Sequence, residues 1–327
     1  MKRRVLISLF FAMFITVSMV GVSSAISFGP AVNLGSAVNT GANERFPDIS
    51  SDDLDLYLSS DRSGGSGLLD MYKSTRPDTG NSFGTPSNLG ATINSTALDT
   101  GPSITGNDVA LFFSSTRSGT GAQGGFDIWV SVSSGAPGNV SSINSTFNDV
   151  APDIHSSGLA MVFHSNRANN GKNDLYVTKR TAIGSPWGTP FSLATASDTD
   201  SNDVGATVSS DGLSLYFASD RDGGIGESGT YDMYVSTRLN TESSFGAAVN
   251  LGAGINSIYD DMGPSISSDG STLYFDSNRS GGFGGFDIYQ STVTAVPEPA
   301  TIALLGIGLF GLAGATVRRR LKKTEQQ

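Results

Sequence analysis

The chain has 327 residues, of which 41 are glycine, none is cysteine and only 15% are charged. This composition excludes a coiled coil or helical bundle, a disulfide framework and cysteine-ligated zinc. The formal net charge of −10 argues against nucleic acid as a partner, because phosphate binding needs a basic surface.

Residues 1–25 have the layout of a secretory signal peptide. Three basic residues at positions 2–4 precede an apolar stretch over residues 5–22, and the small residues Ser23 and Ala25 follow at −3 and −1 of a cleavage site. We therefore predict that the signal peptide is removed and that the rest is exported. An uncleaved anchor helix is the alternative.

A block of about twenty residues recurs five times within residues 26–295. Each copy ends on an arginine, with a proline (alanine in the fourth copy) fifteen residues earlier and an acid three residues before that. A variable glycine-rich loop follows and ends on an aspartate, an apolar residue and Tyr or Trp. The arginines are Arg62, Arg117, Arg167, Arg221 and Arg279; the acids are Glu44, Asp99, Asp149, Asp203 and Asp261; the closing aspartates are Asp70, Asp127, Asp174, Asp232 and Asp287.

Each repeat reads as four strands. A short P-x-I-S segment, a tight turn, an apolar and aromatic run such as 213–218, and a D-I-Y-x-S run are followed by the pattern F-G-x-x-x-N-L-G. That last pattern occurs at 83–90 and 245–252, weakly at 187–194, and in decayed form near 138–143. Four antiparallel strands in about 54 residues indicate a propeller blade, and the sequence lacks the 3.6 periodicity of a helical solenoid.

The fourth-strand pattern also occurs at 28–35, before the first block, and it is missing after the fifth. We therefore predict that the N-terminal strand completes the last blade and protects two sheet edges. The expected fold is an all-β, five-bladed β-propeller of four-stranded antiparallel blades. The predicted blades lie around 44–90, 99–143, 149–194, 203–252 and 261–292, with the closing strand at 28–35.

The block resembles the TolB-type, WD-like propeller repeat, whose pattern is clearest at 264–289, PSISSDGSTLYFDSNRSGGFGGFDIY. The resemblance covers about residues 28–292. Two departures occur: Ala206 replaces the proline of the fourth block, and Ser157-Gly158 alters the turn of the third. The resemblance implies a propeller that mostly binds proteins or polymers, and it implies no particular chemistry.

The predicted strand order brings the acid, the arginine and the closing aspartate of each blade to one rim. Arginine's planar fork suits a structural role that bridges carboxylates and loop carbonyls, and we expect all five arginines and the closing aspartates to be structural anchors. The alternative is that Glu44, Asp99, Asp149, Asp203 and Asp261 form a ring that binds a cation or a cationic partner. The glycine-rich loops at 63–69, 118–126, 222–231 and 280–286 vary, as binding loops on a rigid scaffold do.

Signals for catalysis or metal binding are weak. The only histidines, His155 and His164, occur in the third block, where repeat drift explains them as well as a site does. Carboxylates outside the repeat pattern include Asp55, Asp222, Glu227 and Asp276, and nothing pairs them as a glycosidase requires. GGFGGFD at 281–287 and the D-R-D-G run at 220–223 are similar to calcium motifs but lack the tandem register or the twelfth-position glutamate. We predict no metal or other cofactor, with Ca²⁺ as the alternative.

Residues 296–323 resemble the PEP-CTERM sorting signal. Pro297, Glu298 and Pro299 precede an apolar stretch, 300–317, which is long enough for a transmembrane helix, and Arg318, Arg319 and Arg320 follow. The resemblance implies recognition by an exosortase-type processing protease, removal of the helix, and release or attachment at a bacterial surface. A permanent single-span anchor is the alternative. The G-x-G-x-x-G spacing within this stretch follows no strand, so it does not indicate a dinucleotide site.

Without its two ends, the exported body carries 12 basic and 28 acidic residues, a net charge of −16. We expect a non-catalytic protein of the cell surface or extracellular matrix that binds a polysaccharide or a protein through its rim loops. A glycosidase-like, carbohydrate-active enzyme is the first alternative, and a purely structural surface component is the second.

Overall fold

The computed structural model describes residues 27–168, 170–194, 196 and 200–294, and these form one compact unit. The predicted signal peptide and the predicted helix at 300–317 lie outside the described residues. Among the residues described, no helix is long and apolar enough to cross a membrane.

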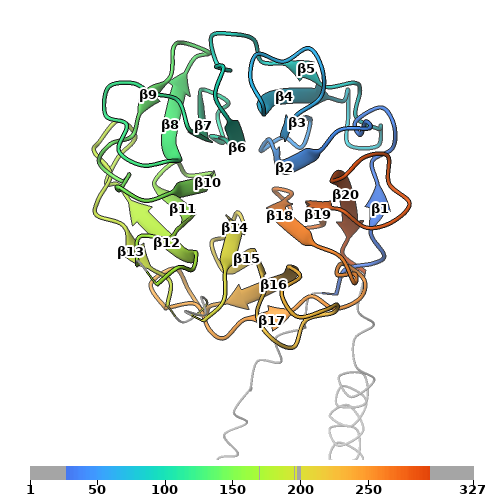
Figure 1. Ribbon diagram of the computed structural model, residues 1–327. Helices are drawn as coiled ribbons and strands as arrows, with labels where there is room; N and C mark the ends of the chain where they lie inside the picture. The colour runs from blue at the N-terminus through green and yellow to red at the C-terminus, as the bar shows by residue number, and fades with distance from the viewer. Residues whose placement is uncertain (1–26, 169, 195, 197–199, 295–327) are drawn as a thin grey trace, which may run out of the picture. The chain divides into compact units, whose positions relative to one another are not determined.

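Five four-stranded antiparallel sheets are arranged as the blades of a ring (Figure 1). Each blade begins with an inner strand beside the central axis and proceeds outward. Blade 1 contains β2 (Glu44–Ile49), β3 (Asp55–Ser60), β4 (Asp70–Thr75) and β5 (Ser87–Asn88); blade 2 contains β6 (Asp99–Ile104), β7 (Ala110–Ser115), β8 (Asp127–Val132) and β9 (Gly138–Asn139); blade 3 contains β10 (Asp149–Ile154), β11 (Ala160–Ser165), β12 (Asp174–Lys179) and β13 (Phe191–Ser192); blade 4 contains β14 (Asp203–Val208), β15 (Ser214–Ser219), β16 (Asp232–Thr237) and β17 (Val249–Asn250).

Blade 5 joins the two ends of the propeller. It contains β18 (Asp261–Ile266), β19 (Thr272–Ser277) and β20 (Asp287–Thr292), and its outer strand is β1 (Val32–Asn33) from the start of the described chain. Val32 pairs with Gln290 and Asn33 with Tyr289. The predicted five-bladed fold with its N-terminal closing strand is thereby confirmed.

Each outer strand contains only two paired residues, so it is shorter than the eight-residue sequence pattern indicated. The reason is local: the asparagine of N-L-G turns its side-chain carbonyl onto the glycine that follows, as Asn88 Oδ1 does by accepting the Gly90 N–H at 2.7 Å. This Asx-type bond favours a turn over further strand pairing.

A β-bulge in every inner strand explains the recurring proline. The ladder register shifts at the same place in all five blades, between Arg45 and Asp48 in the first. Proline fits there because a bulge leaves it without a ladder hydrogen bond to donate. The preceding residue adopts a positive φ in each blade; it is glycine in three blades, but Phe46 and Ala151 in the other two.

Five apolar clusters fill the interfaces between neighbouring blades, one at each interface. Aromatic rings make edge-to-face contacts across three of them: Phe28 with Tyr216, Phe83 with Tyr274, and Phe112 with Trp187, with ring centroids 6.0–6.1 Å apart. The core is therefore divided among the interfaces, and a change in one residue alters one interface.

Candidate functional site

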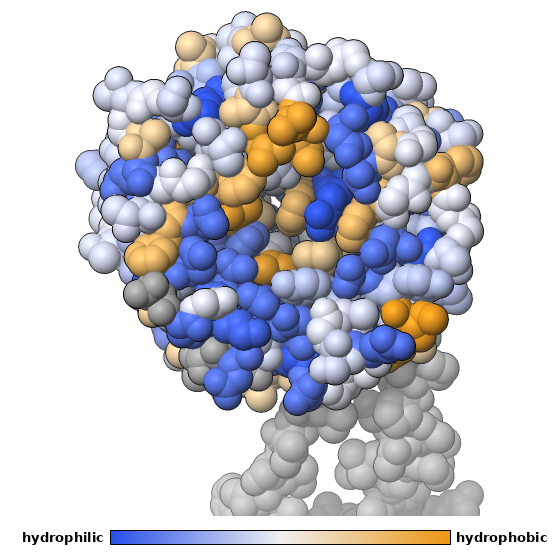
Figure 2. Space-filling model, viewed as in Figure 1, coloured by the Kyte–Doolittle hydropathy of each residue, from blue (hydrophilic) through white to orange (hydrophobic). Residues whose placement is uncertain are grey.

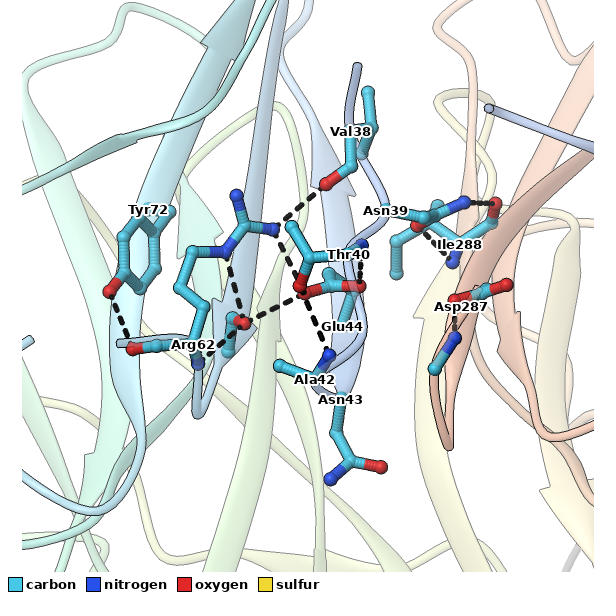
Figure 3. Close-up of polar contacts among 12 residues, drawn as sticks. Val38, Asn39, Thr40, Ala42, Asn43, Glu44, Arg62, Tyr72, Asp287 and Ile288 are labelled. Atoms are coloured by element: carbon cyan, nitrogen blue, oxygen red, sulfur yellow. Dashed lines mark hydrogen bonds and ion pairs between the residues drawn. The ribbon is translucent and has the colours of Figure 1, made fainter. Parts of the chain in front are cut away.

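The first group of predicted residues forms a buried network at the rim of each blade. In blade 1, Arg62 Nη2 donates to Glu44 Oε1 at 3.0 Å and to the Val38 carbonyl at 2.8 Å, while Arg62 Nε donates to Ser60 Oγ at 3.1 Å (Figure 3). Val38 belongs to the segment that enters from blade 5. The arginine therefore ties that incoming segment to the acid at the start of the inner strand.

The same network recurs in all five blades. The arginine–acid contacts of the other blades are Arg117–Asp99 at 2.6 Å, Arg167–Asp149, Arg221–Asp203 at 2.7 Å and Arg279–Asp261. All five acids are fully buried, and the second oxygen of four of them accepts a backbone N–H, as Asp99 does from Ser95 at 2.6 Å. This geometry supports the anchoring role. Binding of a ligand by these five carboxylates stays a prediction, and their burial does not favour it.

The closing aspartates hold the glycine-rich loops. Asp70 accepts the backbone N–H of Gly67 at 3.0 Å and the side-chain amide of Asn88 at 3.0 Å, and Asp287 accepts equivalent bonds from Phe283 at 2.6 Å and Asn33 at 2.9 Å. Asp127 and Asp232 have the same kinds of partner. Asp174 is buried at the start of β12. Loop N–H groups thus serve the scaffold in these blades.

A set of asparagines that sequence reasoning missed completes the scaffold. Asn39 accepts the Ile288 N–H at 2.8 Å and donates to the Ile288 carbonyl at 2.9 Å, so its amide pairs with the strand as a backbone would (Figure 3). Asn94, Asn144 and Asn256 do the same for the third strands of blades 1, 2 and 4. The signal was available as the recurring I-N-S tripeptide.

The remaining predicted candidates are dispersed. Asp276 is buried beside Arg45 at 3.3 Å, and Asp55 contacts Lys73 at 3.1 Å, whereas Asp222 and Glu227 are exposed.

His164 Nδ1 accepts the Gly205 N–H at 3.2 Å, and burial lowers the pKa of this imidazole to about 3. Within the described part of the chain, no group of three or more His, Asp or Glu side chains could hold a metal ion.

Two carboxylates beside the axis were also missed. Asp48 and Asp153 occupy the position after the repeat proline, where the other blades have Ser or Thr, and each accepts a backbone N–H from the next blade, from Ile104 at 2.8 Å and Val208 at 3.1 Å. Burial raises both pKa values, that of Asp153 to about 7, and the neighbouring Asp153 charge raises that of Asp48 further.

The axial space is small. Figure 2 shows one face of the ring, which is hollowed at its centre and has both hydrophilic and hydrophobic residues around the hollow. The axial cavities that Asp48 and Asp153 line measure only about 60 and 20 Å³. Small-molecule sites usually enclose about 300–1,000 Å³. The axis therefore lacks the space for a sugar ring between these carboxylates.

A cavity between blades 3 and 4 measures about 540 Å³. Its wall is apolar at Val162, Leu193 and Phe245, and hydroxyl groups line its edge at Ser157, Ser192, Thr241, Ser243 and Ser244. Phe191 of β13 also lines it and is 51% exposed. We refer to this cavity between blades 3 and 4 as the 3/4 cleft. Smaller clefts, of about 450 and 350 Å³, lie between blades 2 and 3 and between blades 1 and 2.

One wall position of the 3/4 cleft departs from the repeat. The middle position of the second strand is aromatic in four blades, at Tyr57, Phe112, Tyr216 and Tyr274, but in blade 3 it is Val162. Val162 packs in the same cluster as Phe245 of blade 4. The smaller valine leaves space where an aromatic ring lies at other interfaces.

Charged groups of the 3/4 cleft come from its turns. Arg238 stacks on Phe245, 4.4 Å from the ring centroid, and its Nε donates to the Gly212 carbonyl at 2.7 Å. His155 Nδ1 accepts the Ser157 N–H at 3.2 Å, and burial lowers the pKa of this imidazole. Asp211 accepts the Ser209 hydroxyl, which lowers the pKa of this carboxyl. Asp153 lines the inner end.

Comparison with known proteins identifies the C-terminal segment and the fold. Residues 295–320 match the PEP-CTERM protein-sorting motif, which agrees with the sequence prediction. No curated protein matches the chain. TolB from Acinetobacter baumannii is similar in structure at 14% identity and a TM-score of 0.48, over 83% of this chain and 56% of that one. The chain therefore spans little more than half the length of that TolB.

Two further solved structures share the fold at low identity. An alpha-L-arabinofuranosidase from Lactobacillus brevis matches at 11% identity and a TM-score of 0.51, over 82% of this chain and 95% of that one. A GH43_12 from a capybara gut metagenome matches at 11% identity and a TM-score of 0.50, over 84% and 58%. These likenesses concern the fold alone. The chain is an exported five-bladed β-propeller that carries a PEP-CTERM sorting motif and has TolB among its structural neighbours.

Proposed function

We propose that this protein is a non-catalytic polysaccharide-binding propeller of the cell surface or extracellular matrix. The PEP-CTERM motif marks an exported protein with a membrane-anchored sorting signal and implies recognition by an exosortase. Attachment at the surface or release into the matrix is part of the proposal, as is the extracellular polysaccharide as partner.

The observation that carries the proposal is the 3/4 cleft. At about 540 Å³ it has the volume of a small-molecule site, and it combines an exposed aromatic ring, Phe191, with a row of hydroxyl groups. Sugars present apolar ring faces and hydroxyl edges, so this mixture suits them. The glycine-rich loops, by contrast, commit N–H groups to Asp70 and Asp287. We therefore favour the cleft over the rim loops, which were the predicted binding surface.

Affinity electrophoresis of the full chain in mild detergent tests the proposal, with dextran, laminarin, galactomannan and alginate each cast into a native gel. We expect at least one polysaccharide to retard the protein and Phe191→Ala to reduce that retardation. Val249→Ala, which truncates an exposed apolar residue of β17, is the matched control and should migrate like wild type. Unretarded migration in all four gels would contradict the proposal and favour a protein partner or a structural role.

One observation favours a carbohydrate-active enzyme as the second candidate. Asp153, whose pKa is raised to about 7 by burial, lines the same cleft as Asp211, whose pKa is lowered. A glycosidase needs a protonated acid and an ionised carboxylate. Release of reducing ends by wild type, but not by Asp153→Asn, would establish this function; retention without release would establish binding alone.

A further inference from the structure

The interface between blades 5 and 1 provides a filled counterpart of the 3/4 cleft. There Arg76 stacks on Phe83, 4.3 Å from the ring centroid, and its Nε donates to the Asp53 carbonyl at 2.8 Å. Its Nη2 donates to the hydroxyl of Tyr274, which is 1% exposed, at 3.3 Å. The guanidinium therefore has one partner in the turn and another in a phenol from the neighbouring blade.

Arg238 repeats this arrangement at the 3/4 cleft, except for the phenol. Its stacking distance on Phe245, 4.4 Å, and its Nε bond to Gly212, 2.7 Å, match those of Arg76. Nη1 donates to the Thr241 carbonyl at 3.1 Å. In place of Tyr274 stands Val162, which has no hydroxyl group, and the hydrogen bonds of Arg238 to other described residues come from Nε and Nη1, not from Nη2.

We propose that a sugar ring of the bound polysaccharide occupies the space that the tyrosine fills between blades 5 and 1, and that one of its hydroxyl groups accepts the hydrogen bond from Arg238 Nη2. This inference rests on the proposed polysaccharide binding. The ring is an uncharged sugar, because the cleft also carries the acidic side chains of Asp211 and Glu242 beside its cations. Val162 is then the residue that determines whether this interface can accept a ligand.

Val162→Tyr tests the inference, because it restores the side chain that the repeat has elsewhere. The variant should fold at least as stably as wild type, since the new ring fills a cavity and its hydroxyl can meet Arg238. In the affinity gels we expect at least tenfold weaker binding of the neutral polysaccharide that retards wild type. Val249→Tyr places the same residue on exposed β17 and should bind like wild type.

Arg238→Lys provides a second measurement that does not fill the cleft. It keeps the charge but loses the planar fork, and we expect several-fold weaker binding than in wild type. The double variant Val162→Tyr/Arg238→Lys should bind no more weakly than Val162→Tyr alone, because the sugar has already been displaced there. If wild type binds a polysaccharide and folded Val162→Tyr binds it equally well, the inference is wrong and the proposed function stands. If wild type binds none of the four, the proposed function itself fails. Retardation of wild type by alginate alone would overturn the neutral-sugar assignment.

Discussion

The interface between blades 5 and 1 and the interface between blades 3 and 4 are built from the same repeat, and they differ in the aromatic residue at the middle of the second strand. Tyr274 fills the first and accepts a hydrogen bond from Arg76. Val162 leaves the second with a cleft of about 540 Å³ beside Arg238. The interface between blades 2 and 3, where Phe112 supplies the ring without the hydroxyl group, has a cleft of about 450 Å³, and the interface between blades 1 and 2, which has Tyr57, has one of about 350 Å³. The loss of the ring at one position therefore accompanies the largest of these three clefts.

The arginine–acid network lies at the other end of the strands from the 3/4 cleft. It is the same in all five blades, so we expect its removal to cost a similar amount of stability in each. Arg221 is 16% exposed in its side chain and Asp203 is fully buried, so Arg221→Ala leaves a buried carboxylate without its cation. We expect a loss of about 3–5 kcal/mol in the free energy of unfolding. Arg62→Ala should cost a similar amount, because blade 1 repeats the geometry. Chemical denaturation measures both, and an unchanged midpoint for either would show that the arginines are not anchors.

Tyr274→Val should convert the closed interface into a copy of the open one. Removing a ring that is 1% exposed and in edge-to-face contact with Phe83 creates a cavity and leaves Arg76 Nη2 without its acceptor. We expect a loss of about 2–4 kcal/mol in the free energy of unfolding. The reverse change, Val162→Tyr, should lose nothing. Equal losses for the two variants would mean that the interfaces differ by more than this one position.

The sequence predicted the parts of the molecule that repetition enforces. Five blocks, five fourth-strand patterns and the extra copy at 28–35 led directly to five blades and the closing β1. The arginine–acid spacing similarly indicated the rim network. The cleft was harder to foresee, because Val162 looks like an ordinary apolar residue until the ring at the same position of the other blades is known to touch the next blade. Asp48 and Asp153 were missed because their proximity across the axis depends on ring closure.

The titration of Asp153 offers a test of the difference in polarity between the two interfaces, since the corresponding residue of blade 5 is Ser265. Burial raises the pKa of Asp153 to about 7 in the folded protein, above the ordinary value of 3.8. The folded state therefore holds this proton more tightly than the unfolded state. The stabilisation is complete below about pH 4 and is lost as the pH rises toward 7.

We expect the free energy of unfolding to fall by about 1–3 kcal/mol over this range, because partial solvent contact of the side chain screens part of the shift. Asp153→Asn should reduce this fall, and Ser265→Ala should leave it unchanged. The pKa of Asp48 is raised for the same main reason, so the remaining slope in Asp153→Asn reports its contribution. A profile that rises between pH 4 and 7 in wild type would contradict the assignment.

The smallest expected effect separates the two guanidinium groups themselves. Arg76→Lys and Arg238→Lys lose the same stacking, on Phe83 and Phe245, and the same Nε bond to a turn carbonyl, so those losses cancel in the comparison. Arg76→Lys additionally leaves the buried Tyr274 hydroxyl without its donor. Arg76→Lys should therefore lower the free energy of unfolding by about 0.5–1.5 kcal/mol more than Arg238→Lys does, which is the usual net value of one hydrogen bond. In a Val162→Tyr background the difference should disappear, because Arg238 then has a phenol to lose as well. Equal stabilities of the two lysine variants in the wild-type background would mean that the Arg76–Tyr274 hydrogen bond contributes nothing to stability. The 3/4 cleft would then differ from the interface between blades 5 and 1 in its open space alone, and not in a hydrogen bond that Arg238 lacks.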